Sequence, residues 1–229
     1  MAREVFLTVS AIPPASEATS EAVSSLRASL GARFPRTENE SYLDGLLRGM
    51  PRVALARLTA ISLLPTLLGS AGIDSRELLL SRDANGRPYV PNAPDLDFNL
   101  SHSDSHAVCA VMPGGGRVGV DVEEPIPPDR AAKLMQRYAK DGELARFERA
   151  TQPWEGFLRL WTLREAIAKQ DGRGQPLNFD VSSVPTGLHV CCGHLPDTGA
   201  ALALCLPDGI SYTAIYSRSD SLPIVWDEL

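Results

Sequence analysis

The sequence predicts an α+β fold, in which helices pack against sheets of short, mainly antiparallel strands. Two segments, 51–68 and 154–170, have the length and pattern of helices. Many short segments around them have the apolar or alternating pattern of strands. With 229 residues, of which 44% are apolar, the chain has enough hydrophobic side chains for one large domain or two small ones.

The first half is predicted to alternate between helices and strands. Pro51 stands at a favoured first position of its helix, and apolar residues recur along 51–68 at spacings of two to four. Asn85-Gly86 is a strong turn signal between two extended segments. The predicted elements are strands over 5–9, 78–80, 97–100 and 107–112, an extended segment over 87–90, and helices over 16–30, 41–48 and 51–68.

The second half is expected to begin after Gly114-Gly115-Gly116, a flexible turn that divides the chain into 1–115 and 116–229. Glycine favours the position after a helix, so Asp171-Gly172 is the predicted end of the long helix. The predicted elements are strands over 118–123, 189–192, 200–206, 212–217 and 223–226, and helices over 129–138, 142–150 and 154–170.

Composition excludes some classes of protein. The net charge of −6 and the aromatic content of 6% argue against a general nucleic-acid binder and against a base-stacking surface. The spacing of the four cysteines fits no usual zinc site, so ordinary strand cysteines in a reduced compartment are expected. They are Cys109, Cys191, Cys192 and Cys205.

The longest apolar run, 55–72, contains Arg57 and Pro65, so we expect no transmembrane span. The apolar stretch near the N-terminus is short and starts among charged residues, and it predicts no signal peptide. We therefore expect a cytoplasmic protein that acts without a membrane.

The segment 118–123 is the centre of the predicted chemistry. Its three valines alternate with Gly119, Asp121 and Glu123, so a strand places the two acids on one face, about 7 Å apart. Unpaired neighbouring carboxylates repel each other, and a hard cation such as Mg²⁺ removes that cost. The alternative interpretation is an exposed strand end with two solvated acids.

A second pattern lies in the helix over 154–170. Trp161, Glu165 and Lys169 follow at i, i+4 and i+8 and share one face. Glu165 could give a third oxygen to a cation held by the acidic strand, and Lys169 could then meet phosphates bound by that cation. The alternative is an ordinary surface Glu–Lys pair.

A third pattern is Ser101-His102-Ser103 at a strand end, where a hydroxyl and an imidazole N–H suit phosphate contacts. No Gly-x-Ser-x-Gly elbow and no P-loop is present. A structural histidine is the alternative. Basic residues at the start of the helix over 51–68 are either ligand contacts or a solvated face; they are Arg48, Arg52 and Arg57.

Three segments, in this order along the chain, resemble the signature of the 4′-phosphopantetheinyl transferases of the surfactin-synthetase-activating (Sfp) type: 99–103, 118–123 and 161–169. Gly86-Arg87-Pro88, which lies upstream of them, also resembles part of that signature. The resemblance covers roughly 86–170. It implies two similar α/β halves that form a pseudo-dimer within one monomer, with coenzyme A in the cleft between them. The chain departs from the family in having Arg87 and Arg164 where lysine is common. Both keep the charge, although arginine's planar fork can contact phosphate differently.

The resemblance also implies roles for single residues. Asp121, Glu123 and Glu165 would bind Mg²⁺, with Mn²⁺ as an alternative. Lys169 would contact coenzyme A phosphates, and Asp121 would also border the bound coenzyme. Further expected contacts to coenzyme A come from Ser101, His102, Arg87 and Pro88, with Arg52 and Arg57 as candidates.

The expected reaction moves the 4′-phosphopantetheine arm of coenzyme A to a serine of an apo acyl or peptidyl carrier protein and releases 3′,5′-ADP. Glu165 is the expected general base, and Lys169 is expected to stabilise the leaving phosphate. Two alternatives remain open: a catalytically silent coenzyme A or nucleotide binder, and a Mg²⁺-dependent phosphodiester hydrolase.

Overall fold

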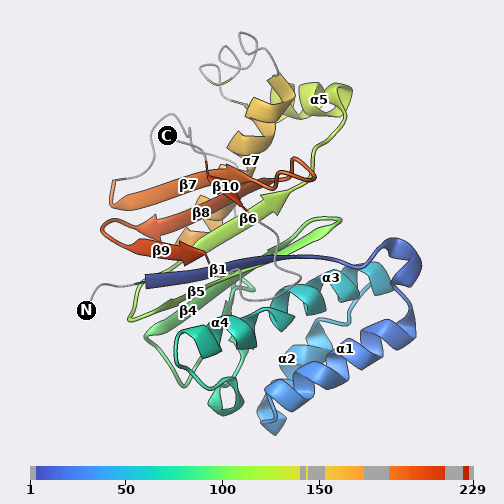
Figure 1. Cartoon of the computed structure of the whole chain (residues 1–229), viewed down its shortest axis with the longest axis vertical. Coiled ribbons are helices and arrows are strands. Elements are labelled where there is room, and N and C mark those ends of the chain that lie inside the picture. The colour runs from blue at the N-terminus through green and yellow to red at the C-terminus, as the bar shows by residue number, and fades with distance from the viewer. Residues whose placement is uncertain (1–3, 140–142, 144–152, 173–185, 215–223, 227–229) are drawn as a thin grey trace.

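Two four-stranded sheets organise the chain in a computed structural model that describes residues 4–139, 143, 153–172, 186–214 and 224–226 (Figure 1). The first sheet has the order β4-β5-β1-β9 and the second has the order β10-β7-β8-β6. The strands are β1 (Glu4–Ala11), β2 (Ser81–Arg82), β3 (Pro88–Tyr89), β4 (Leu96–His102), β5 (His106–Pro113), β6 (Gly119–Glu123), β7 (Leu188–His194), β8 (Ala201–Pro207), β9 (Ser211–Ala214) and β10 (Val225–Trp226).

Helices cover the outer faces of these sheets (Figure 1). On the first sheet, side chains of α3 such as Leu58 and Ile61 pack with Phe98 and Val111 in one buried cluster. On the second, Ala166 and Ile167 of α7 pack on β7 and β8. The helices are α1 (Ser20–Arg33), α2 (Glu40–Gly45), α3 (Pro51–Ser62), α4 (Leu64–Ser70), α5 (Pro128–Tyr138) and α7 (Pro153–Asp171).

The two sheets share a third core between them. Val118, directly before β6, and Val120 and Val122 of β6 are at most 1% exposed and pack in one cluster with side chains of β1, β5 and β8. The layers are therefore helices, sheet, sheet and helix, and the predicted α+β class is confirmed. The similarity of two halves and the division at 115/116 stay predictions. β9 lies beyond that division in the chain but pairs in parallel with β1 of the first sheet.

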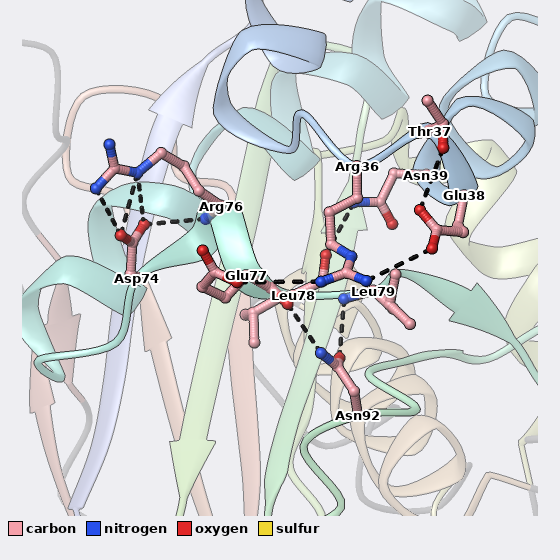
Figure 2. A network of polar contacts seen from close by, with 10 residues as sticks. All are labelled: Arg36, Thr37, Glu38, Asn39, Asp74, Arg76, Glu77, Leu78, Leu79 and Asn92. Atoms are coloured by element: carbon pink, nitrogen blue, oxygen red, sulfur yellow. Dashed lines mark hydrogen bonds and ion pairs between the residues drawn. The ribbon is translucent and has the colours of Figure 1, made fainter.

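The strand predicted over 78–80 is not a strand in the structure, where β2 begins at Ser81. The reason is an asparagine that takes the place of a neighbouring strand. Asn39 Nδ2 donates to the oxygen of Leu78 at 2.9 Å, and Leu80 N donates to Asn39 Oδ1 at 2.7 Å. Asn92 binds Leu79 N in the same way, within the polar network of Figure 2. Side chains thus satisfy the backbone groups that a strand would pair.

Other boundaries differ for local reasons. The helix expected over 51–68 divides into α3 and α4 near Pro65, whose ring cannot continue the hydrogen bonding of a helix. The helix predicted over 142–150 lies outside the described residues, except for Glu143, and so do 215–217 and Pro223 of the last two predicted strands.

The stretch Pro51–Ser70 is long and apolar enough to cross a membrane by length and composition, with a mean hydropathy of 1.5 over its best window. In the structure 61% of that window is buried inside the protein. Its leucines and isoleucine belong to the core against the first sheet.

Candidate active site

Gly119 allows α7 to lie directly on β6. A Cβ atom at this position would clash with the backbone oxygen of Ala166 and would lie 2.6 Å from the backbone nitrogen of Gln170. Since backbone atoms cannot move aside as a flexible side chain can, only glycine fits here. This close approach brings Glu165 and Lys169 of α7 over the acidic side of β6.

A row of polar side chains on β4 joins the two sheets at the same place. Asp97 Oδ2 accepts a hydrogen bond from Val118 N at 2.8 Å, and Asn99 Oδ1 accepts one from Val120 N at 2.9 Å. Ser101 Oγ, the next residue on that face, donates to Asp121 Oδ1 at 2.7 Å. The Ser101-His102 segment and the acidic strand, 20 residues apart in the chain, therefore meet.

Asp121 is the centre of the site. It is 3% exposed, and its Oδ1 accepts from Lys169 Nζ at 2.6 Å as well as from Ser101. Its other oxygen, Oδ2, is buried and has no hydrogen-bond partner among the described residues. A buried carboxylate oxygen without a donor is costly, and it leaves lone pairs for a ligand.

The two glutamates beside Asp121 have raised pKa values. Burial and the negative charge of Asp121 raise the pKa of Glu123 to about 7, although Lys169 and a hydrogen bond from Trp161 oppose the shift. Burial and Asp121 also raise the pKa of Glu165. Glu165 accepts no hydrogen bond from the described residues. The carboxylates of Asp121, Glu123 and Glu165 together therefore carry more negative charge than Lys169 can balance.

Trp161 keeps its place through aromatic neighbours. Its ring centroid lies 5.4 Å from that of Tyr138 and 6.0 Å from that of Phe157, and its Nε1 donates to Glu123 Oε1 at 3.2 Å. Trp161, Glu165 and Lys169 thus all face β6, as their helical spacing predicts. The roles of these residues in catalysis stay predictions.

The donor chemistry around Asp121 suits a divalent cation. Carboxylate oxygens are the ligands that Mg²⁺ prefers, and Asp121 Oδ2 is the unpartnered buried oxygen that such an ion would need. In the part of the chain that the structure describes, however, no three acidic, histidine or cysteine side chains converge closely enough to form a metal site. The ammonium of Lys169 lies against Asp121 instead.

A pocket of about 320 Å³ opens beside this cluster. It lies between the β2–β3 hairpin, β4 of the first sheet and α7, the helix that covers the second sheet. Glu165 and Lys169 form part of its wall. The lining residues are Arg82, Asn85, Gly86, Arg87, Pro88, Asn99, Leu100, Glu165, Ala168, Lys169 and Gly172. Pro88, one of the expected coenzyme contacts, therefore borders the pocket.

Positive charges lie near His102, the last residue of β4. Removal of water around the ring, followed by the charges of Lys169 and Arg57, lowers the pKa of His102. At neutral pH the ring is therefore mainly neutral and can still donate one N–H. Arg57 also donates to the backbone oxygen of Arg48 at 2.8 Å, whereas Arg52 pairs with Asp104 at 3.3 Å on the surface.

The two arginines at family lysine positions are both buried. Arg87 is 8% exposed and pairs with Asp97 at 2.6 Å. Arg164 is 1% exposed, pairs with Glu143, and donates to the oxygen of Tyr138 at 3.0 Å. Through these contacts each guanidinium binds groups of the protein itself and connects different segments of the chain. The site prediction gave Arg87 a ligand contact, and that contact stays a prediction.

Sequence reasoning missed one polar cluster beside the site. Glu124 Oε1 accepts from Ser103 Oγ at 2.7 Å, contacts His106 Nδ1 at 2.6 Å and accepts from Ser105 N at 3.2 Å. Burial raises the pKa of Glu124, but the hydrogen bonds from His106 and Ser103 outweigh this and lower it. These contacts connect the turn after His102 to Glu124, which directly follows β6. An acid directly after the Asp-x-Glu segment was the only signal in the sequence.

Comparison with known proteins identifies similar chains. The family model described as the 4′-phosphopantetheinyl transferase superfamily matches residues 117–191. A "4′-phosphopantetheinyl transferase" of Bacillus subtilis is 31% identical over 140 residues, which are 60% of this chain and 56% of that protein. A further Bacillus subtilis protein, "4′-phosphopantetheinyl transferase Sfp", is 30% identical over 114 residues, or 49% of each chain.

The "4′-phosphopantetheinyl transferase AcpT" of Salmonella typhimurium is 36% identical over 132 residues, which are 56% of this chain and 67% of that protein. The chain spans about half the length of the Bacillus subtilis relatives that it matches. The family match includes Asp121, Glu123, Glu165 and Lys169, whereas Ser101 and His102 precede it.

Proposed function

This chain belongs to the 4′-phosphopantetheinyl transferase superfamily, and on that premise we propose that it transfers the 4′-phosphopantetheine arm of coenzyme A to a carrier protein. The acceptor is a serine hydroxyl of an apo acyl or peptidyl carrier protein. The products are the holo carrier and 3′,5′-ADP. We further propose that the enzyme works as a monomer in the cytoplasm and binds neither membrane nor nucleic acid.

The observation that carries this proposal is the cluster around Asp121 beside the 320 Å³ pocket. Two carboxylates with raised pKa values and one buried unpartnered oxygen lie within reach of a single lysine. Such an excess of negative charge costs stability in the free protein. A substrate that carries phosphates together with a divalent cation would balance both signs of charge.

Asp121, Glu123 and Glu165 are the residues that would hold Mg²⁺, or Mn²⁺, since all three present carboxylate oxygens. When bound, the ion would neutralise charge on the pyrophosphate of coenzyme A. Cation binding also requires ionised carboxylates, so it would lower the pKa of Glu123 from about 7.

The transfer exchanges one P–O bond for another. The serine oxygen of the carrier attacks the phosphorus that bears the pantetheine arm, and the bond from that phosphorus to the oxygen of 3′,5′-ADP breaks in line. Glu165 takes the proton of the serine hydroxyl, and its raised pKa makes it a better acceptor than an ordinary glutamate. Lys169 stabilises the negative charge of the departing phosphate.

Two groups on β4 would hold the phosphates before reaction. Ser101 already donates to Asp121, and its hydroxyl can turn to a phosphate oxygen. His102 is mainly neutral and can donate one ring N–H, and it lies close enough to Lys169 and Arg57 to be influenced by both charges. The alternatives of a silent coenzyme binder and of a hydrolase find no support in the relatives described above, whose names all state a transferase.

Incubation with apo carrier, coenzyme A and Mg²⁺ tests the proposal, with intact-protein mass spectrometry as the measurement. We expect the carrier to gain the mass of one phosphopantetheine and 3′,5′-ADP to accumulate in equal amount. A chelator should stop both. Release of 3′,5′-ADP without a change in carrier mass would instead identify a hydrolase, and coenzyme binding without either product would identify a silent binder. Fatty-acid, polyketide and peptide-synthetase carriers should be compared in parallel.

A further inference from the structure

The β2–β3 hairpin carries two arginines that border the same pocket but have different surroundings. Arg82 is the last residue of β2, and Arg87 precedes β3 directly. Arg82 is exposed, whereas the side chain of Arg87 is 7% exposed. The difference matters because a phosphate can only be bound by N–H groups that are not already in use.

The guanidinium of Arg87 is used inside the protein. Its Nη2 donates to Asp97 Oδ2 at 2.6 Å and to the oxygen of Val118 at 2.9 Å, and its Nη1 donates to the oxygen of Lys169. Asp97 balances its charge. A phosphate that recruited Arg87 would remove the charge partner of the buried Asp97 carboxylate and the donor that Arg87 gives to the oxygens of Val118 and Lys169, which is unfavourable.

These bonds hold the end of α7. The last carbonyls of a helix lack partners within it, and positive groups near them are stabilising. Arg87 binds the oxygen of Lys169, Arg117 donates to that of Asp171 at 2.7 Å, and Asn85 donates to that of Gly172 at 2.9 Å. Arg87 therefore fixes the turn of α7 from which Lys169 reaches Asp121.

Arg82 has donors to spare. Its Nη1 donates to the oxygen of Gly86 at 2.7 Å, and its guanidinium lies 5.1 Å from the centre of the Tyr42 ring. No acidic side chain among the described residues pairs with it. The remaining N–H groups of its planar fork suit the oxygens of a phosphate.

The other side of Arg82 is also suited to an anion. Arg82 borders a second pocket of about 320 Å³, which Arg48, Tyr42 and Glu38 line as well. The carboxylate of Glu38 is paired with Arg36. The hydroxyl of Tyr42 is buried without a hydrogen-bond partner among the described residues. Burial raises the pKa of Tyr42 to about 12, so the hydroxyl keeps its proton and remains a donor.

We propose that Arg82, and not Arg87, is the hairpin arginine that binds a phosphate group of coenzyme A, and that Arg87 is a positioning residue for Lys169. The inference rests on the proposed function for the identity of the ligand. It replaces the ligand contact that the family resemblance assigns to Arg87.

Coenzyme A titration by calorimetry tests the binding half of the proposal. Arg82→Ala should weaken coenzyme A binding at least about tenfold, the effect of one lost charge-assisted hydrogen bond, with an unchanged melting temperature. Arg82→Lys should recover part of the affinity. Arg76→Ala removes another exposed arginine, which pairs with Asp74 away from the pocket, and should leave the affinity unchanged. Wild-type affinity in Arg82→Ala would overturn the proposal.

Steady-state kinetics test the positioning half. Arg82→Ala should raise KM for coenzyme A while kcat stays close to that of the wild type. Arg87→Lys keeps the charge but loses the fork that reaches three oxygens, so it should lower kcat more than it raises KM. If Arg87→Lys raised only KM while Arg82→Ala had no effect, Arg87 would be the ligand contact and the proposal would be wrong.

The binding assay is independent of the reaction. If the wild type modified no carrier but Arg82→Ala still lost affinity for coenzyme A, the proposed transfer would fail and the role of Arg82 would stand. If transfer proceeded normally and Arg82→Ala bound coenzyme A like the wild type, only the role of Arg82 would be overturned.

Discussion

The helices that cover the two sheets differ in what they bury. On the first sheet, α3 and α4 bury Leu55, Leu58, Ile61 and Leu67 in an apolar cluster. On the second, α7 buries Thr162 and Arg164 completely or nearly so, and it directs Glu165 and Lys169 toward the acidic side of β6. The helices on the first sheet therefore form an ordinary hydrophobic core, whereas α7 on the second sheet combines packing with charged groups.

The difference identifies which side carries the chemistry. Helices that pack on a sheet through apolar side chains stabilise it without any ligand. Around β6, burial and the negative charge of Asp121 raise the pKa of Glu123 to about 7, and one buried oxygen of Asp121 has no donor among the described residues. Groups held in such an unfavourable state are typical of functional sites. Substitutions on the helical side of the first sheet and substitutions around β6 and α7 should therefore have different effects on activity and stability.

Asp121→Asn should have the largest effect. It keeps the shape of the side chain but removes the charge that pairs with Lys169 and would bind the cation, so transfer should fall by at least about a thousandfold, as expected for the loss of several kcal/mol of charge stabilisation. Carrier modification followed by mass spectrometry measures this, with circular dichroism to check the fold.

Asp44→Asn in α2 is the matched control on the helical side of the first sheet, since Asp44 also pairs with a basic residue, Arg27, at 2.8 Å. It should transfer at the wild-type rate, because an exposed ion pair contributes little. Equal activity of Asp121→Asn and Asp44→Asn would mean that the cluster on β6 is structural.

Glu165→Gln should come next. The variant keeps the size of the side chain but cannot accept the serine proton, so kcat should fall by at least about a hundredfold, the low end for a lost general base. Lys169→Ala should instead weaken both coenzyme A affinity and turnover, because a lysine on phosphate acts in the ground state and in the transition state. Two fully active variants with slightly lowered melting temperatures would identify an ordinary surface pair.

Gly119→Ala should mainly reduce stability. The added methyl group meets backbone atoms of Ala166 and Gln170, so α7 must shift and the free energy of unfolding should fall by about 3 kcal/mol. Gly69→Ala in α4 is the control, because nothing lies within 4 Å of a Cβ there. It should raise stability by up to about 1 kcal/mol through helix propensity. Urea unfolding measures the stability of both variants. Equal changes in the free energy of unfolding would show that the contact between β6 and α7 does not require glycine at position 119.

Glu123→Gln should have the smallest effect on stability, and that effect should depend on pH. The folded wild type binds a proton at Glu123 more tightly than the unfolded chain does, so its free energy of unfolding should fall as pH rises from about 4.5 to about 7. The variant lacks this titration and should be more stable than the wild type at pH 8 by about 1–3 kcal/mol. Urea unfolding with a chelator at pH 5 and pH 8 measures the difference.

Added Mg²⁺ provides a second comparison for Glu123. At pH 8 the ion should raise the melting temperature of the wild type and have less effect on Glu123→Gln, because binding to the folded state stabilises it by mass action. An equal rise in both proteins would show that Glu123 is no metal ligand. A wild type whose stability did not change between pH 5 and pH 8 would contradict the raised pKa of Glu123.

Much of the fold and part of the site follow from local patterns in the sequence. Alternation along 118–123 predicts which side chains of β6 enter the core, and the spacing of Trp161, Glu165 and Lys169 predicts the face of α7 that meets β6. Both rest on the fixed periods of strand and helix, so they need no knowledge of the partner element. The helix over 51–68 could be predicted for the same reason, but not its division near Pro65 into α3 and α4.

The tertiary structure alone decided how the charges pair. The sequence shows Arg87 in a Gly-Arg-Pro segment, but only packing places it against Asp97 and the end of α7. The role of Gly119 depends on how closely two backbones approach, and the pairing of β9 with β1 depends on where the chain returns. Periodicity determines the direction of a side chain relative to its own element. The charge that it meets, and the water removed around it, depend on distances between elements that are remote in the sequence, and those distances set the pKa values and free donors of the site.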